Sequence, residues 1–509
     1  GVYFPNAFIT NPLCCPSRAS FLSGGFYPFN THVLTNQKPN GNATAFFDEG
    51  TLPVLLQRKG YKTAMIGKYL NGYAAIKPRI PPGWTTFIEP EGSWTQYRVF
   101  EGSSTPDEPG VGVQRPEDTY LTYFLRDEAL QFIEENSASP FFIYLTPKAP
   151  HGPATPAPED EGLFSDYVFE SPSVPETDLS DKPAYIRENA EDDEEEEDDE
   201  GPGGHGIEFF RDQLRSLQPV DRMVKEIVDK LEEKNLLDKT VIVFAGDNGY
   251  MWGEHGFFAK QKPYEESVKV PLVVRMPKAP SRIDNHVVAV NLDVPTMILK
   301  LAGIEKQTDG LDLYSLVAGA NIKWRDGLAL QAWRNNPESI AFTVPFWVAL
   351  RTEKYKYIEY DTGEKELYDL SVDPFELESL HANPAYAGVM NEFSQGLKPF
   401  TGMYILFSKP PAGITGENYS FELKAVAGKP PYHWALTDLE PFVGVKEKKF
   451  VDCFKRLPEG LELREDGTIA GVPTKQEYCA VGVEVKDSSV SQQDGLPQRY
   501  RYSVKIEIK

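Results

Sequence analysis

Cysteine is scarce in this 509-residue chain. Cys14 and Cys15 are adjacent near the start, and Cys453 and Cys479 lie near the end. Four cysteines in so long a chain exclude a disulfide scaffold of the kind that stabilises small secreted domains. Cys453 and Cys479 fall within one predicted β domain. We expect them either to form a disulfide, if the protein is exported, or to remain reduced in the core.

Long apolar runs and positive charge are scarce as well. No stretch approaches the roughly eighteen apolar residues of a membrane-spanning helix, so no transmembrane segment is predicted. The chain has 52 Lys and Arg against 76 Asp and Glu, a net charge of -24. This excess argues against nucleic acid and against a long sulfated polymer as partners, because both need clustered cations. A small or terminal sulfate group can still bind a local basic pocket, since charges are screened within about 8 Å at physiological salt.

An initiator Met is also missing, and the chain opens at Gly1 directly before an apolar stretch typical of a strand. We expect a further N-terminal segment in the natural protein, with a signal peptide as one candidate for part of it. The expected location is therefore secreted, periplasmic or lysosomal.

The residue pattern of the first part of the chain predicts an α/β domain. From Gly1 to about residue 320, apolar strands alternate with amphipathic helices, the pattern of a sheet with helices on both faces. The runs 141–145 and 241–245 are short and bulky, as in buried strands. Apolar residues between 210 and 231 recur at helical spacing. We expect that helix to pack on the sheet.

Composition changes twice further along the chain. Residues 191–200 are all acidic, and like charges that bury nothing predict a solvated, disordered loop rather than a calcium or partner site. Strand-like runs follow at 346–350 and 354–358. After Phe400, short alternating strands and turns are typical of a β-sandwich, as listed here: 419–426, 477–485 and 500–508. The predicted domains are 1–324, 325–399 and 400–509.

The most informative segment begins at Cys14 and reads Cys-Cys-Pro-Ser-Arg-Ala-Ser-Phe-Leu-Ser-Gly. Pro16 favours a helix start, where the helix dipole and Arg18 would favour a thiolate at Cys14. For an isolated cysteine, a buried structural role is the commoner interpretation. However, Cys-x-Pro-Ser-Arg followed by Leu-x-Gly resembles the sulfatase signature, in which the first cysteine is oxidised to formylglycine. The match selects Cys14, whereas Cys15 occupies the variable position and is expected to pack in the core.

The resemblance implies the chemistry as well. A hydrated aldehyde has two hydroxyl groups on one carbon, one to attack sulfur and one to expel sulfate afterwards, and serine lacks the second. Arg18 would hold the formylglycine side chain and steady the metal site. The implied partners are a formylglycine-generating enzyme and a sulfated small molecule or carbohydrate.

A second segment resembles the family. Asp247 and Asn248 follow the run 241–245, so their oxygens project from a strand end where ligands bind in α/β sheets. Adjacent oxygen donors suit Ca²⁺, although Asp-Asn-Gly alone is more often a turn. With Gly-Glu-His-Gly and Lys260 downstream, the segment resembles the second sulfatase signature. It implies one Ca²⁺ ion bound by Asp247, Asn248 and the modified Cys14, with Lys260 on the sulfate oxygens.

Two further positions match the family. His151 ends an Ala-Pro-His segment after the run 141–145, and the resemblance makes it the acid or a sulfate-binding imidazole. Lys68 lies in Gly-Lys-Tyr-Leu-Asn and matches a sulfate-contacting lysine. Many sulfatases have histidine where this chain has Leu70. The variant is similar to the branch of N-acetylglucosamine-6-sulfatases and heparan 6-O-endosulfatases, which points to sugar 6-sulfates.

One part of the family pattern is missing from the chain. Sulfatases carry their first two metal ligands as paired aspartates on the opening strand, some tens of residues before the cysteine, and this sequence starts too late to contain them. We therefore expect a longer natural protein. We also expect the 509-residue chain alone to bind calcium weakly and to be inactive.

The resemblance implies an alkaline-phosphatase-like fold: a mostly parallel sheet between helices, then a small α+β subdomain. The tail, with Leu-Pro-Glu-Gly-Leu at 457–461 and a Gly-Val-Pro-Thr turn ending at 474, resembles the immunoglobulin-like domain of many bacterial surface and secreted enzymes. We expect a spacer or packing module, with carbohydrate binding as the alternative.

Two rival functions remain open at this point. A phosphoester or phosphonate hydrolase of the same superfamily can share the cysteine motif, but such relatives tend to place His after the Asp, where this chain has Asn248. A non-catalytic sugar-binding protein would fit the missing aspartates. The polar residues retained at Cys14, Arg18 and Lys260 argue against it.

Overall fold

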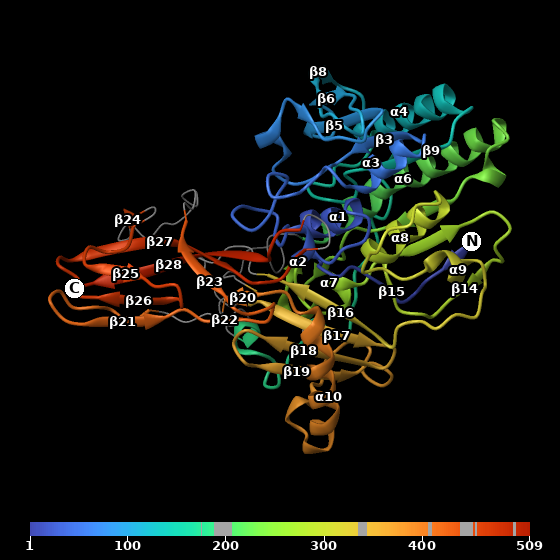
Figure 1. The fold of residues 1–509 in the computed structure, drawn as a ribbon. Helices are drawn as coiled ribbons and strands as arrows, with labels where there is room; N and C mark the ends of the chain where they lie inside the picture. The colour runs from blue at the N-terminus through green and yellow to red at the C-terminus, as the bar shows by residue number, and fades with distance from the viewer. Residues whose placement is uncertain are drawn as a thin grey trace.

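The computed structural model covers residues 1–509 and describes all of them except 175, 188–205, 334–343, 406–409, 438–450, 454–455 and 492–494. The acidic run 191–200, expected to be a solvated loop, lies outside the described residues. Within the described ranges, no helix is both long and apolar enough to cross a membrane. Figure 1 shows an N-terminal α/β part, an antiparallel sheet with α10 beside it, and a C-terminal β part.

The first sheet has the strand order β8-β6-β5-β3-β9. Its strands are β3 (Lys62–Gly67), β5 (Thr86–Gly92), β6 (Tyr97–Gly102), β8 (Val113–Glu117) and β9 (Phe141–Thr146). β3 pairs in parallel with β5 and β9, whereas β6 is antiparallel to both of its neighbours, β5 and β8. Because β3 and β9 are parallel and in register to their ends, the residues that follow them emerge at the same edge.

Helices cover this sheet as the apolar spacing predicts. α4 (Leu121–Asn136) buries Leu125 and Phe132 in one cluster with Ile66 of β3. α6 (Ile207–Glu233) confirms the helix expected over 210–231, but it packs mainly against α4, and only its Ile227 lies beside the cluster on the sheet. The short α3 (Leu52–Arg58) leads into β3.

The second sheet has the order β10-β13-β1-β14. Its strands are β10 (Ile242–Ala245), β13 (Leu272–Arg275), β1 (Val2–Tyr3) and β14 (Arg282–Ile283). Helices α8 (Val290–Leu301) and α9 (Leu313–Val317) close one apolar cluster with β1 and β13, built from Val2, Leu272, Val294 and Leu313 among others. Beside it, β2 (Ala7–Phe8) pairs in parallel with β15 (Val288–Ala289).

The α/β architecture is as expected, but the described strands of the N-terminal part form two mixed sheets instead of one mostly parallel sheet. Only residues 93–96 join β5 to β6, which permits a hairpin and excludes the long crossover that parallel strands need. Ser93 Oγ closes this turn by donating to the carbonyl of Gln96 at 2.7 Å. Among the described strands, β9 and β10 each form the edge of their sheet. On β10, the side chain of Phe244 is 43% exposed.

The middle part is an antiparallel sheet in sequence order. Its strands are β16 (Gly327–Ala332), β17 (Trp347–Thr352), β18 (Tyr355–Tyr360) and β19 (Lys365–Asp369), and α10 (Ala387–Leu397) packs on β17 and β18. The strand-like runs 346–350 and 354–358 are thus strands β17 and β18. Glu265 of α7 (Glu265–Val268) joins this sheet to the first part through ion pairs with Arg351 and Lys356.

The C-terminal part is all β. Its strands are β20 (Tyr404–Ile405), β21 (Tyr419–Glu422), β22 (Ala425–Val426), β23 (His433–Leu436), β24 (Val451–Asp452), β25 (Leu461–Leu463), β26 (Thr468–Gly471), β27 (Glu477–Lys486) and β28 (Arg499–Ile508). β21, β26 and β25 form one sheet, and β27 pairs with β23, β24 and β28 in another. The predicted strands 477–485 and 500–508 are present, whereas 419–426 is divided into β21 and β22.

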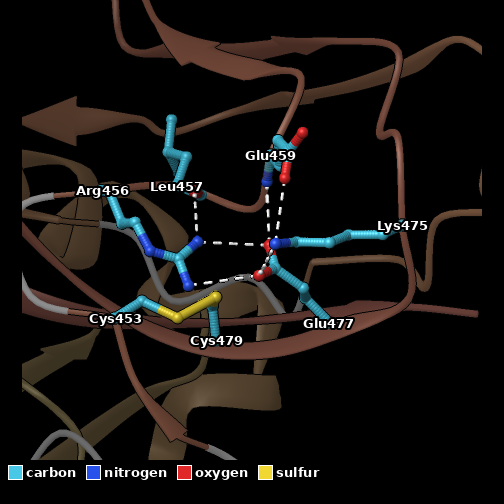
Figure 2. Close-up of a disulfide and its surroundings, with 7 residues drawn as sticks. All are labelled: Cys453, Arg456, Leu457, Glu459, Lys475, Glu477 and Cys479. Carbon is cyan, nitrogen blue, oxygen red and sulfur yellow. Dashed lines mark hydrogen bonds and ion pairs between the residues drawn. A yellow bond between two sulfur atoms is a disulfide. The ribbon is translucent and has the colours of Figure 1, made fainter.

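Cys453 and Cys479 form a disulfide within this part (Figure 2). Next to it, Glu477 pairs with Arg456 at 3.1 Å and with Lys475 at 3.3 Å. The disulfide and the ion pair with Arg456 both join β27 to the segment before β25, whereas Lys475 lies between β26 and β27. Of the two alternatives left open by the sequence, the structure has the disulfide.

The C-terminal part contacts the N-terminal part through the ends of β27 and β28 (Figure 1). The side chain of Asn40 makes two hydrogen bonds with the backbone of Arg501, and Ser491 Oγ donates to the carbonyl of Asn30 at 3.0 Å. Tyr27 and Tyr500 belong to one apolar cluster. The two parts therefore share a packed interface.

Candidate functional site

The site is built around the first residue of helix α1 (Cys14–Leu22). Leu13 precedes it in extended conformation and gives no side-chain cap. Instead, Asn36 from a separate loop accepts a hydrogen bond from the N–H of Cys15 at 2.8 Å. Pro16 in the first turn lacks an N–H that the helix would leave unpaired. The thiol of Cys14 consequently stands at the positive end of the helix.

The ends of three strands deliver polar residues to this point. Lys68 follows β3, Asp247 and Asn248 follow β10, and the segment that leads to His151 follows β9. Thr146, the last residue of β9, donates its hydroxyl to the carbonyl of Lys68 at 2.8 Å. The parallel register of β3 and β9 thus fixes the main chain next to Lys68.

Arg18 connects these strand ends from α1. Its Nε lies 2.8 Å from Oδ2 of Asp247, and its Nη1 donates to the carbonyl of Lys68 at 2.5 Å. The Arg18 side chain is buried. A buried cation paired in this way orients both partners, and its removal would leave the Asp247 carboxylate uncompensated.

Lys260 reaches the thiol from a hairpin. The hairpin consists of β11 (Met251–Trp252) and β12 (Phe258–Ala259), and Lys260 comes directly after it. Its Nζ lies 3.0 Å from Sγ of Cys14 and 3.4 Å from Oδ1 of Asn248. Ala259 and Gln261, on either side of Lys260, have φ of 68° and 80°. Such left-handed backbone costs about 1–3 kcal/mol for residues other than glycine, so the surrounding structure holds Lys260 in place against strain.

The charges around Cys14 favour its ionised form. Burial and the Asp247 carboxylate favour the neutral thiol, but a hydrogen bond with His151 and the charges of Lys260 and Lys68 outweigh them and lower the Cys14 pKa to about 6. Burial raises the pKa of the neighbouring Cys15 to about 12. The two adjacent cysteines therefore differ sharply in acidity, which agrees with the different roles that the sequence predicts for them.

Asp247 carries the negative charge next to these cations. Burial opposes its ionisation, but Arg18, Lys68 and Lys260 outweigh burial and lower its pKa to about 2. Three cations thus surround one carboxylate. The remaining positive charge suits an anion.

A cavity of about 160 Å³ adjoins these residues, and Lys68 and His151 form part of its wall. His151 is exposed, and its Nδ1 lies 3.0 Å from the carbonyl of Gly152. Pro90 and Leu121 supply apolar lining. An anionic group bound next to Cys14 would therefore have space for an attached organic group.

The structure brings together all seven residues singled out from the sequence, which are Cys14, Arg18, Lys68, His151, Asp247, Asn248 and Lys260. Sequence reasoning missed Asn36, the external cap of α1, and Thr146, which fixes Lys68. Neither position carried a signal, because each acts through the main chain of another segment.

The described residues do not complete a calcium site. Asp247 and Asn248 supply at most three side-chain oxygen atoms, whereas Ca²⁺ takes six to eight oxygen ligands. Asp247 already pairs with Arg18, and Asn248 with Lys260. In the described part of the chain, no group of three or more His, Cys, Asp or Glu side chains is placed to hold a metal ion. The calcium ion implied by the resemblance therefore needs further ligands.

The fold and the site define an α/β protein with an anion-binding pocket around a cysteine at a helix N-terminus. Comparison with known proteins refines this class. The family model described as "Sulfatase" matches residues 1–304, and that of "N-sulphoglucosamine sulphohydrolase, C-terminal" matches residues 253–401. The chain therefore belongs to the sulfatase family.

Individual proteins similar to the chain are named as sulfatases as well. The arylsulfatases of Volvox carteri and Chlamydomonas reinhardtii are 29% and 30% identical to the chain over 74% and 76% of its length. The chain spans 66% and 67% of these two proteins. An N-acetylglucosamine-6-O-sulfatase of Bacteroides thetaiotaomicron is 27% identical, with 79% of this chain and 80% of the relative covered.

Solved structures share the fold. One, of a protein in complex with its substrate D-glucosamine-2-N,6-O-disulfate, matches with a TM-score of 0.66 and 24% identity, covering 79% of this chain and 90% of the other. The phosphonate monoester hydrolase of Agrobacterium radiobacter also matches, with a TM-score of 0.58, 20% identity, and coverage of 78% and 88%. The fold alone thus does not separate sulfate from phosphonate chemistry.

Proposed function

We propose that the protein is a sulfuric ester hydrolase that releases sulfate from a small sulfated sugar, with residue 14 converted to formylglycine. The observation that carries the proposal is the contact of Cys14 with Lys260 and Asn248 at the positive end of α1. A hydrated aldehyde at residue 14 supplies two hydroxyl groups, one to attack sulfur and one to expel sulfate.

The other residues act on the ester in this proposal. Lys260 and Lys68 neutralise the sulfate oxygens, where negative charge grows during the reaction. His151 donates a proton to the leaving alcohol or binds the sulfate. Arg18 holds Asp247 and the main chain of Lys68 in position, as its two hydrogen bonds support. Asp247 and Asn248, with residue 14, are the proposed calcium ligands, and no step is assigned to the ion.

The relatives support the substrate class. Proteins named N-acetylglucosamine-6-sulfatase, from Homo sapiens among others, match over 77% of this chain, which favours a sulfated amino sugar. The disulfide between Cys453 and Cys479 favours an oxidising compartment, which agrees with a secreted, periplasmic or lysosomal location. The proposed partner is a formylglycine-generating enzyme. In the proposed division 1–324, 325–399 and 400–509, the last part is an immunoglobulin-like packing module.

Two cysteine variants test the proposal. The tests use the chain extended by the aspartate-bearing opening strand that the family resemblance implies, with calcium present. After coexpression of this protein with a formylglycine-generating enzyme, mass spectrometry of the Cys14 peptide should detect formylglycine. Cys14→Ala should abolish sulfate release with the fold nearly intact, whereas Cys15→Ala should retain substantial activity. Activity in Cys14→Ala, or equal loss at both positions, would refute the nucleophile. Faster hydrolysis of a phosphate or phosphonate ester than of the matching sulfate ester would favour the related hydrolases instead.

A further inference from the structure

Lys148 is a cation of the cavity wall that the proposed reaction does not use. It lies between the end of β9 and His151, and it lines the same cavity as Lys68. Its Nζ donates to the carbonyl of Gly92 at 3.2 Å and lies 5.7 Å from the ring centroid of Trp94. The side chain is thus held against the β5–β6 turn.

No carboxylate compensates Lys148 among the described residues. Its contacts are a carbonyl and an aromatic face, both of which accept a cation without neutralising it. Burial, and then the charge of Lys68, lower its pKa. A second lysine near the same hairpin shows the ordinary arrangement, since Lys77 pairs with Glu89 at 3.5 Å and with Glu91 at 2.8 Å.

An unneutralised lysine next to another cation is unfavourable in an empty pocket and favourable around an anion. In a chain of net charge -24, carboxylates are plentiful, yet none pairs with Lys148 in the described ranges. Lys148 also has different neighbours from Lys260, which contacts Cys14 and Asn248 directly. The two lysines therefore offer binding positions for two different anionic groups.

We propose that Lys148 binds a second anionic group of the substrate, a carboxylate or another sulfate, while Lys68 and Lys260 hold the sulfate that is released. This rests on the proposed sulfatase function and names the substrate class: a small sugar with at least two anionic groups. The Lys148 Nζ provides a charge-assisted hydrogen bond to the second group. Pro90 and Leu121, which line the cavity, give apolar surface for the sugar ring.

Three 6-sulfated substrates test the proposal: N-acetylglucosamine 6-sulfate, glucosamine 2-N,6-O-disulfate, and a 6-sulfated glucosamine linked to a uronic acid. The wild-type protein should prefer whichever dianionic substrate places its second group at Lys148. Lys148→Met should lower kcat/KM for that substrate at least tenfold more than for the monosulfate, chiefly through KM. Tenfold corresponds to about 1.4 kcal/mol, the low end for a hydrogen bond to a charged group.

Lys59→Met is the matched control, because Lys59 is exposed near the start of β3, at the opposite end from Lys68. It removes the same charge and should leave kcat/KM unchanged for all three substrates. Lys148→Arg should restore part of the preference.

If Lys148→Met lowers kcat/KM equally for all three substrates, or lowers it for none of them, the proposal is overturned. Should Lys148→Met misfold, the wild type gives an independent answer: added salt should raise KM more steeply for the dianionic substrate. Equal salt dependence would also count against it. Failure of the proposed function is distinguishable, because a protein with confirmed formylglycine, the added aspartate-bearing opening strand and calcium would then hydrolyse none of the three.

Discussion

The side-chain amide of Asn40 pairs with the backbone of Arg501, 461 positions away along the chain. Its Nδ2 donates to the carbonyl of Arg501 at 2.6 Å, and its Oδ1 accepts from the N–H of Arg501 at 2.8 Å. The same loop carries Asn36, which caps α1 at Cys15. Strand β28 of the C-terminal part is therefore connected to the helix that presents Cys14.

Asn40→Ala should lower both thermal stability and turnover. The variant removes two hydrogen bonds from a buried side chain, at a cost of about 1–3 kcal/mol for each backbone group left unpaired. Turnover should fall because the loop that holds Asn36 loses its support. Thermal unfolding and sulfate release measure the two effects. Asn285→Ala, at an exposed position, is the control, and identical behaviour of the two variants would contradict the proposed coupling.

Lys260→Ala and His151→Ala should each lower kcat by at least about 100-fold, because each removes a charge or proton donor from the reacting ester. The measurement uses a substrate with a poor leaving group, for which proton donation matters most. Lys260→Arg and Lys260→Gln should recover only part of the rate, since the planar guanidinium of Arg cannot take the place of a compact ammonium group and Gln carries no charge. The control is Lys239→Ala, which removes an exposed charge at the other end of β10 and should leave kcat unchanged. Wild-type turnover in His151→Ala would refute its role.

The unmodified chain should gain one thiolate as the pH rises through about 6, the pKa of Cys14. Ultraviolet absorbance of the thiolate, in protein made without the formylglycine-generating enzyme, measures this step, and Cys14→Ser should lack it. Cys15 should not contribute, because its pKa is about 12. Since the Cys14 pKa lies below its ordinary value of 9.0, ionisation stabilises the fold fully above pH 9.0, and the contribution is lost as the pH falls through about 6. A step that persists in Cys14→Ser would contradict the assignment.

The double variant Cys453→Ser/Cys479→Ser should lose about 3–4 kcal/mol of unfolding free energy in the C-terminal part. The disulfide closes a loop with a sequence separation of 26, and constraint of the unfolded chain by such a loop accounts for this amount. Denaturant unfolding followed by tryptophan fluorescence is suitable, because Trp434 is buried there. A reductant should destabilise the wild type and leave the double variant unchanged. If the reductant destabilises the wild type and the double variant equally, the disulfide is not the bond through which it acts.

The candidate site residues could be singled out because they lie in short motifs that resemble the sulfatase signatures, several of them at strand ends. Lys68 and His151 follow β3 and β9, whose parallel register brings their ends together. Asp247 follows β10, and Arg18 on α1 joins it to Lys68. Each of these positions belongs to a short run of residues that resembles a family signature, and such a run can be recognised in one sequence.

What could not be predicted depends on contacts between distant segments. The pairing of Asn40 with Arg501 and the cap of Cys15 by Asn36 leave no trace in local composition. The division into two sheets arises from strand partners, and apolar runs such as 241–245 do not specify their partners. The choice between disulfide and reduced cysteines was open for the same reason. Lys148 lay within the His151 segment, but its lack of a carboxylate partner is visible only in three dimensions.

The edge strands β9 and β10 bear on how the chain behaves in solution. An edge strand presents unpaired N–H and C=O groups, and among the described strands each of these two has a neighbour on one side only. Phe244 of β10 also exposes apolar surface on the face of the sheet beside this edge. Repulsion between molecules of net charge -24 opposes self-association through these edges. Because the screening length shrinks from about 10 Å at 0.1 M salt to about 3 Å at 1 M, concentrated salt should promote aggregation of this chain rather than keep it dispersed.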